Sequence, residues 1–206
     1  MKQTARVISL VLNPFIMPLL GVIFLLKFHG IYSIIYTEKF GYTLIFLALI
    51  LTLLFPFISI YVLYRSRLIS DLSLSKREER VLPSIITVLY YLGFYYFLRR
   101  IEGLDPIIIS GFLGGCVALA LSIAITTRWK ISLHAQGISS LAGLCVGVCQ
   151  MTFVSHTALN IFLLFAIGLV GTSRLILQKH TPLQVYAGAG IGFFIPYIFV
   201  VNGWWV

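Results

Sequence analysis

The chain has 206 residues, of which 60% are hydrophobic and only 10% are charged. Soluble domains carry about 25% charged residues, so this composition excludes a water-soluble globular protein and predicts one dissolved in a bilayer. Lys and Arg outnumber Asp and Glu by 15 to 6, and beside apolar segments such a basic excess favours contact with anionic headgroups over nucleic-acid binding.

The apolar runs do not alternate with polar residues, which indicates helices rather than strands. Backbone groups inside a bilayer must also be satisfied within their own segment. The expected fold class is therefore all-α, a polytopic transmembrane helical bundle of six to seven spans that forms a single integral membrane domain over 1–206. In chain order the candidate spans cover 7–28, 41–64, 82–98, 105–127, 135–153, 157–173 and 183–203.

Small and cyclic residues inside these runs predict local structure. Two glycine pairs four residues apart, Gly143 with Gly147 and Gly188 with Gly192, predict close helix packing. Prolines inside the spans should kink them or be accommodated by neighbouring helices, and they stand at Pro14, Pro18, Pro56 and Pro196. The cysteines have no metal or redox spacing, so we expect small packing residues at Cys116, Cys145 and Cys149.

Seven crossings would place the chain ends on opposite sides of the membrane. One side, called face A, then holds the N-terminus and the loops 65–81, 128–134 and 174–182. Eleven basic residues fall on face A, and four fall on the opposite face, namely Lys27, Lys39, Arg99 and Arg100. The positive-inside rule makes face A cytoplasmic. Five of the basic residues on face A could instead serve a phosphate site, and without them six remain on face A against four on the other face. The side of the membrane on which face A lies therefore stays open.

The stretches "RWKISLHAQG" and "GTSRLILQKHTPLQVYAG" add His134 and His180 to the basic loops of face A. Fixed positive charges and hydroxyl donors at the edge of hydrocarbon suit a phosphate carried on a lipid tail. Two histidines add a candidate nucleophile and a candidate acid, which points to phosphoryl transfer. The other two histidines, His29 and His156, lie on the opposite face and are expected to have no functional role.

The segment "SRLILQKH", Ser173 to His180, resembles the third signature of the type 2 phosphatidic acid phosphatase superfamily, S-R-x5-H-x3-D. The segment "ISLH" at 131–134 resembles the second signature, P-S-G-H, and two predicted spans separate the signatures in both cases. The resemblance covers roughly 131–206. It implies a core similar to these phosphatases and to vanadium haloperoxidases in the C-terminal part of the chain.

The resemblance implies a role for each matching residue. His180 would attack phosphorus and form a phosphohistidine, and His134 would protonate the leaving oxygen and later activate water. Arg174 would hold the phosphate oxygens together with Ser132 and the backbone amide of Leu133. The superfamily uses no metal and no other cofactor, so none is expected here.

Two parts of the superfamily pattern differ in this chain. The first signature, K-x6-R-P, is not matched, and its nearest counterparts are Arg80 first, then Lys76 or Arg77. Gln184 stands where the superfamily has the Asp that orients the nucleophilic histidine. Either another carboxylate replaces it, or the enzyme is slow, or the site binds phosphate without turnover. The carboxylates in question are Asp71, Glu78 and Glu79, of which the two glutamates are also expected to pair with Arg77 and Arg80.

The function expected from these features is a lipid phosphate or pyrophosphate phosphatase of the bacterial inner membrane, acting through a phosphohistidine. Its substrate would be phosphatidic acid, phosphatidylglycerol phosphate or a polyprenyl pyrophosphate. The alternative is a non-catalytic phospholipid-binding or transport protein on a degenerate phosphatase fold. A small-molecule transporter or channel is a weaker reading, because no charged residue lies deep in a span. Expected partners are the lipid phosphate and membrane lipids, not nucleic acid, with a homo-oligomer left open.

Overall fold

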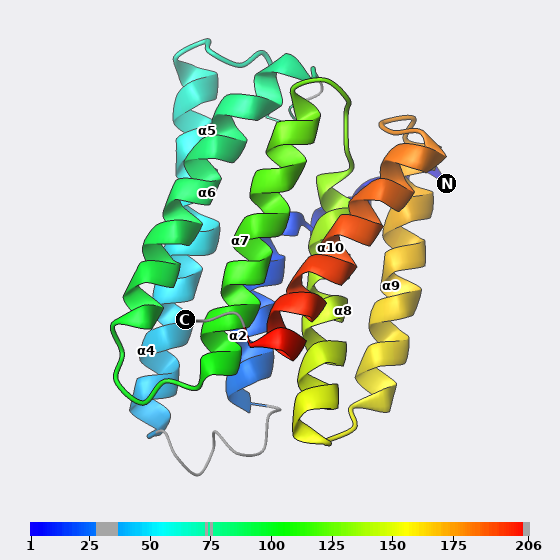
Figure 1. Ribbon diagram of the computed structural model, residues 1–206. Helices are drawn as coiled ribbons and strands as arrows, with labels where there is room; N and C mark the ends of the chain where they lie inside the picture. The colour runs from blue at the N-terminus through cyan, green and yellow to red at the C-terminus, as the bar shows by residue number, and fades with distance from the viewer. Residues whose placement is uncertain (28–36, 73, 75, 204–206) are drawn as a thin grey trace.

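The chain folds into helices that run between the two ends of one bundle (Figure 1). The computed structural model describes residues 1–27, 37–72, 74 and 76–203, and these contain no strand. The expected all-α class is therefore confirmed for this part of the chain. In order, the helices are α1 Lys2–Val11, η1 Pro14–Ile16, α2 Met17–Lys27, α4 Glu38–Ala48, η2 Leu49–Leu54, α5 Phe55–Arg65, α6 Glu78–Arg99, α7 Pro106–Thr126, α8 Leu133–Thr152, α9 Thr157–Ile176 and α10 Pro182–Asn202.

Six helical stretches of the described chain are long and apolar enough to cross a membrane. They are Lys2–Lys27, Glu38–Arg65, α6, α7, α9 and α10. Large apolar side chains also cover the outside of the bundle, as on α9 with Ile161, Phe162, Leu164 and Phe165. Exposed apolar surface of this extent would be unstable in water and is stable against lipid tails. The protein is a multi-pass membrane protein.

The helix α8 was also expected to span the membrane, and it differs in composition from the other six. It has 20 residues, equivalent to about 30 Å, and it runs between the same two ends of the bundle (Figure 1). It contains no Asp, Glu, Lys or Arg but includes Gln136, Ser139, Ser140 and Gln150, and half of its residues or more are buried. Because neighbouring helices surround α8, its side chains need not be as apolar as those that face lipid.

The first apolar stretch is broken at Pro14, as the sequence predicts. Helix α1 ends at Val11, and the side chain of Asn13 accepts a hydrogen bond of 3.0 Å from the amide of Phe15, which starts the 3-10 turn η1. Pro14 packs against α8, where a Cβ on Gly137 would lie 3.0 Å from the Pro14 Cα. The break therefore turns the chain beside the N-terminal half of α8.

The second stretch, from Glu38 to Arg65, contains an irregularity that the sequence analysis did not predict. Between α4 and α5 the backbone forms the π-helical segment η2, which ends just before Pro56. Proline lacks the amide needed for the regular helical bond, and a wider turn accommodates this loss. The Thr52 hydroxyl donates to the Ala48 carbonyl at 2.7 Å and satisfies one acceptor in the segment.

Helices α8 and α10 pack closely through the two predicted glycine pairs, so that prediction is confirmed. A Cβ on Gly188 would lie 2.5 Å from the Ser132 carbonyl oxygen, and one on Gly192 would clash with the Gln136 carbonyl oxygen. Gly143 approaches the backbone of α10 in the same way, at Phe193. The N-terminal turns of α8 and α10 consequently lie side by side, and the Ser132 amide donates to the Gln184 carbonyl at 3.2 Å.

The loops predicted to share face A do lie at one end of the bundle. In Figure 1 the α5–α6, α7–α8 and α9–α10 connections are at the same end as the N-terminus, and the α6–α7 and α8–α9 connections are at the other. His156 precedes α9 at that other end, where its ring packs edge-on against Phe24 with centroids 5.6 Å apart. His29 lies outside the described residues.

Candidate active site

A tight turn at the end of α9 brings His180 back toward Arg174. Gln178 has a positive φ of 52°, and the amides of Gln178 and Lys179 donate to the Leu175 and Arg174 carbonyl oxygens at 2.9 and 3.1 Å. A residue in the left-handed region commonly ends a helix in this manner. The turn brings His180 within electrostatic range of the Arg174 guanidinium.

Gln184 holds His180 in one orientation and in one tautomer. Its Oε1 lies 3.2 Å from the His180 Nδ1 and also accepts the Thr181 amide at 3.2 Å, in a capping box that begins α10. The backbone amide can only donate, so the shared atom must be the amide oxygen. His180 Nδ1 therefore carries the proton. The other ring nitrogen, Nε2, keeps its lone pair.

His134 lies in the first turn of α8 and is held by the N-terminal helix. Its ring forms a hydrogen bond with the backbone of Ser9 in α1 and interacts electrostatically with Arg174 and Arg80. These are the same two arginines that act on His180. The two histidines predicted from distant parts of the sequence therefore lie within electrostatic range of the same two guanidinium groups.

Arg80 and Arg174 are buried charges without a carboxylate ion pair in the described part of the chain. Their exposed fractions are 6% and 8%, and the two guanidinium groups repel each other electrostatically. Arg80 Nε donates to the Leu74 carbonyl at 2.7 Å, and the Arg80 guanidinium is attracted electrostatically by Asp71. Arg174 Nε is buried and has no hydrogen-bond partner. Buried charge is unfavourable unless paired, so this arrangement is suited to an anion.

Lys130 adds a third cation from the loop before α8. Burial and the charges of Arg80, Lys179 and Arg174 lower the pKa of Lys130 below its ordinary value. Burial, followed by Arg80, Arg174 and Lys130, lowers the pKa of His180 to about 3, although its bond to Gln184 acts in the opposite direction. His180 is therefore neutral at physiological pH. The five residues are called the histidine–arginine cluster below: Arg80, Lys130, His134, Arg174 and His180.

Lys76 and Arg77, the other candidates for the first signature, lie outside this cluster. Lys76 Nζ pairs with Glu79 at 3.1 Å, and Arg77 pairs with Glu78 at 3.1 Å and donates to the Arg128 carbonyl at 2.5 Å. The expected pairing of Glu78 with Arg77 is confirmed. That of Glu79 with Arg80 is wrong, because Glu79 turns to Lys76. Arg80 pairs with neither glutamate and interacts electrostatically with both histidines.

Ser132 and Leu133, predicted to bind phosphate, lie where the chain enters α8. Ser132 is fully buried, and its Oγ accepts the amide of Ala135 at 3.4 Å as the cap of the helix. The side chain of Ser132 is thus engaged in capping. The amide of Leu133 is in the first turn, where an α-helix offers no acceptor of its own. It is the better placed of the two to donate to an anion.

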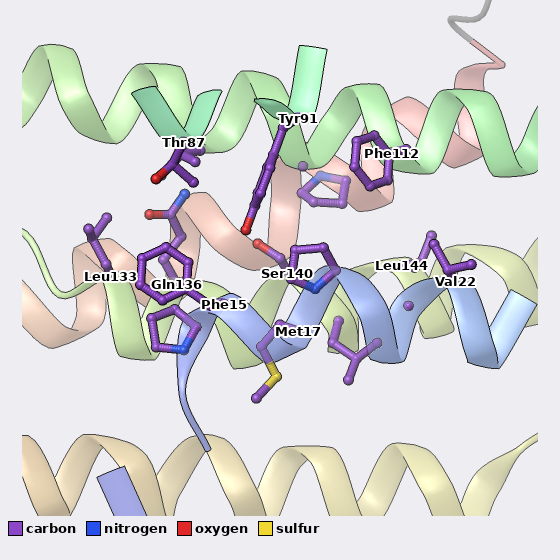
Figure 2. A pocket seen from close by; sticks show the side chains of 18 of the residues that line it. Phe15, Met17, Val22, Thr87, Tyr91, Phe112, Leu133, Gln136, Ser140 and Leu144 are labelled. Atoms are coloured by element: carbon purple, nitrogen blue, oxygen red, sulfur yellow. The ribbon is translucent and has the colours of Figure 1, made fainter. Parts of the chain in front are cut away.

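A cavity of about 130 Å³ lies between η1, α2, α6, α7 and α8. Figure 2 shows its lining, which includes Phe15, Met17, Val22, Phe112, Leu133 and Leu144. Leu74 also lines it, and the carbonyl of Leu74 is the acceptor for Arg80. The apolar cavity therefore adjoins the histidine–arginine cluster.

Sequence reasoning missed this cavity and the contact between Ser9 and His134. Several prolines and glycines line the cavity, among them Pro14, Pro18, Gly21, Gly111 and Gly137. The prolines were noted as kinks, and nothing in their spacing indicates an enclosed space. The sequence does not indicate the contact between Ser9 and His134, because the backbone of Ser9 rather than its side chain makes this contact.

The arrangement has the parts needed for phosphoryl transfer to a histidine. It offers one imidazole with a free Nε2, a second imidazole, and guanidinium groups short of anionic partners. No group of three or more His, Cys, Asp or Glu side chains that could hold a metal occurs among the described residues. Comparisons with protein families, with curated proteins and with solved structures found no match to this chain.

Proposed function

We propose that this protein is a lipid phosphate or pyrophosphate phosphatase of the bacterial inner membrane, and a divergent member of the type 2 phosphatidic acid phosphatase superfamily with its core at 131–206. One observation carries the proposal. His180, held with Nδ1 protonated by Gln184, shares two buried guanidinium groups with His134, and Arg174 Nε has no partner. A phosphate group would supply the missing negative charge.

The first step transfers the phosphoryl group to His180. Arg80, Arg174 and Lys130 bind the phosphate oxygens and stabilise the charge that develops on them. Nε2 of His180 attacks phosphorus, and the bond from phosphorus to the leaving oxygen breaks with its electron pair. In the proposed step, His134 takes up a proton when the anionic phosphate offsets the charges of Arg80 and Arg174. It gives this proton to the leaving oxygen, which departs as the lipid alcohol or the lipid monophosphate.

The second step regenerates the enzyme. His134, now neutral, takes a proton from water as the water oxygen attacks the phosphohistidine. The bond between phosphorus and Nε2 breaks, its electrons return to His180, and inorganic phosphate leaves. Gln184 accepts from the Nδ1–H throughout, but as an amide it brings no charge to the cationic phosphohistidine.

The cavity beside the cluster supports a lipid substrate over a soluble one. An apolar cavity of about 150 Å³ in a soluble protein binds benzene, so the cavity of about 130 Å³ here has room for a short stretch of a hydrocarbon chain. With the head at the histidine–arginine cluster, the start of the tail would enter this space and the remainder would lie among the lipids.

Gln184 favours a second candidate, a phospholipid-binding or transport protein that does not turn its ligand over. Three cations that could bind phosphate are present in the cluster, whereas the negative charge that stabilises a phosphohistidine is absent next to the ring. This candidate predicts that phosphate lipids bind in an Arg174-dependent manner and are recovered unchanged.

Phosphate release by the purified protein tests the proposal. We expect inorganic phosphate from phosphatidic acid, phosphatidylglycerol phosphate or a polyprenyl pyrophosphate, with and without a chelator. His180→Asn should abolish release and the acid-labile phosphoprotein formed on rapid quenching. His156→Asn, a matched change at the other end of the bundle, should leave both unchanged. Release that persists in His180→Asn would refute the mechanism, and binding without release would favour the second candidate.

A further inference from the structure

The cavity next to the histidine–arginine cluster has the polar side chains of Gln136 and Thr87 at the end closer to the cluster, where Leu133 and Phe15 also lie, and it has mainly apolar side chains at the other end. Figure 2 shows Leu133, Gln136 and Thr87 toward one end, and Val22, Phe112 and Leu144 toward the other. Ser84 also lines the cavity, four residues after Arg80 on α6. The polar end thus continues directly from the phosphate-binding groups.

Gln136 presents an unused hydrogen-bonding group at this polar end. The residue is only 3% exposed, and its Oε1 is buried without a hydrogen-bond partner. Its side chain points toward Thr87 across the cavity (Figure 2). A buried acceptor left unsatisfied is unfavourable, so the amide is placed for a group that the protein itself does not provide.

Thr87 presents a second acceptor on the opposite wall. Its hydroxyl donates to the Pro83 carbonyl at 2.8 Å, which uses the only proton of that hydroxyl and leaves its lone pairs. Gln136 Oε1 and Thr87 Oγ are therefore two acceptors at the same end of the cavity, and they favour a ligand with a hydroxyl donor. The remaining amide protons of Gln136 can donate to a carbonyl oxygen.

The distance from the cluster fits the linker of a glycerol-based lipid. Ser84 and Thr87 follow Arg80 by four and seven residues on α6, about 6 and 10 Å along the helix axis. In an acylglycerol phosphate, the free hydroxyl and the ester oxygens stand only a few bonds beyond the phosphate oxygen. With the phosphate at Arg80, these groups reach the first turns of the cavity wall.

We propose that Gln136, with Thr87 and Ser84, selects acylglycerol phosphates by binding the free glycerol hydroxyl and the ester group between phosphate and tail. This inference rests on the proposed function and narrows its substrate class. A polyprenyl phosphate has only hydrocarbon in that position, so it would leave Gln136 unsatisfied. Sites that hydrogen-bond a substrate hydroxyl reject analogues without it far more strongly than apolar sites reject one methylene.

The experiment compares two ligands with the same tail length, a monoacylglycerol phosphate and an alkyl phosphate without hydroxyl or ester. Two quantities are measured for each ligand in detergent, kcat/KM for phosphate release and the ligand-induced rise in Tm. We expect wild-type protein to favour the acylglycerol phosphate by about tenfold or more in kcat/KM, and to show the larger rise in Tm with it.

Gln136→Leu should reduce this preference to near unity while it retains activity on the alkyl phosphate. Gln150→Leu is the matched control, because it makes the same change at the far end of α8, where Gln150 bonds Tyr197 at 2.6 Å. Gln150→Leu should keep the full preference. If Gln136→Leu does not fold, Thr87→Val provides the second variant and should lower the preference in the same direction.

The outcomes separate this inference from the proposed function. Equal kcat/KM for the two ligands, or a preference unchanged in Gln136→Leu and Thr87→Val, would overturn the inference and leave the phosphatase standing. A Tm preference for the acylglycerol phosphate that depends on Gln136, without phosphate release from any ligand, would support the recognition site and refute the activity. Faster turnover of a polyprenyl phosphate than of the acylglycerol phosphate would also overturn the inference that Gln136 selects acylglycerol phosphates.

Discussion

In the proposed mechanism, Gln184 determines how His180 reacts. Its oxygen accepts both the His180 Nδ1–H and the Thr181 amide, so the ring is oriented and one tautomer is selected. An aspartate or glutamate would do the same and would also neutralise the cationic ring after phosphoryl transfer. In serine proteases, exchange of the histidine's aspartate for an amide costs about 10⁴ in rate, largely through the tautomer. Here the tautomer is already correct, so a smaller deficit is expected.

Gln184→Glu should therefore accelerate turnover. The variant keeps the side-chain length and the capping box, in which glutamate is a preferred residue, and adds a charge next to Nδ1. We expect kcat to rise about tenfold, within the ~10⁴ seen for serine proteases. KM should rise as well, because the new carboxylate competes with phosphate for the cations. A kcat that falls while the protein remains folded would contradict this role.

At the residue scale, the sequence predicts which residues belong to the candidate site better than it predicts which side chains pair with each other. The sequence singles out Arg174, His180 and His134, and in the structure both histidines interact electrostatically with Arg80 and Arg174. The sequence ranks Arg80 before Lys76 and Arg77 but does not indicate with which side chains the three cations pair. The ion pairs separate them, since Glu78 pairs with Arg77 and Glu79 pairs with Lys76, whereas Arg80 is buried and pairs with neither. Such competition among neighbouring charges is not encoded in spacing.

At the element scale, the packing of α8 on α10 fixes the site. Helix α8 carries His134 and Gln136, and α10 begins at Pro182, directly after the loop that carries His180. The two helices are in backbone contact at Gly188 and Gly192. Any increase in their separation would move the two histidines relative to each other. The glycine spacing predicted this contact, but not which helix would be the partner.

Gly192→Ala should separate α8 from α10 and lower both stability and activity. Its Cβ would clash with the Gln136 carbonyl oxygen, and the backbone cannot yield as a flexible side chain would. We expect a loss of about 1–3 kcal/mol in stability, as for overpacked cores, measured as a lower Tm in detergent. Gly190→Ala is the matched control on the same helix, because nothing lies within 4 Å of its Cβ. Equal Tm values for the two variants would contradict the interpretation.

At the scale of the whole molecule, hydropathy predicts the bundle but not its interior. The apolar runs correspond to helices because a bilayer permits little else, and the structure extends several of them, such as 82–98 to Glu78–Arg99. The π-helical segment η2 and the cavity depend on contacts between distant helices, so local patterns do not predict them. The central position of α8 follows from its neighbours, and its polar residues are the one sequence feature that indicates it.

The stability of the whole molecule should decline in mild acid because of the histidine–arginine cluster. The pKa of His180 is about 3 in the folded protein, against an ordinary 6.5, so below about pH 6.5 the unfolded chain binds a proton that the folded chain does not. Stability from this group is complete above pH 6.5 and is lost progressively toward pH 3. We expect Tm in detergent to fall between pH 7 and pH 5, and to fall less in His180→Asn. Parallel pH profiles for both proteins would contradict this assignment.

The bond from the Ser132 amide to the Gln184 carbonyl joins the starting turns of two helices. An α-helix carries a macrodipole with roughly half a positive charge at its N-terminus, and free amides there attract anions. In the proposed site, the partial charge at the start of α8 therefore adds to the side-chain cations around the bound phosphate, whereas the capping box of α10 already uses amides at the start of that helix. Part of the attraction resides in the peptide backbone itself, so a chain stripped of all three cationic side chains should still retain weak affinity for phosphate.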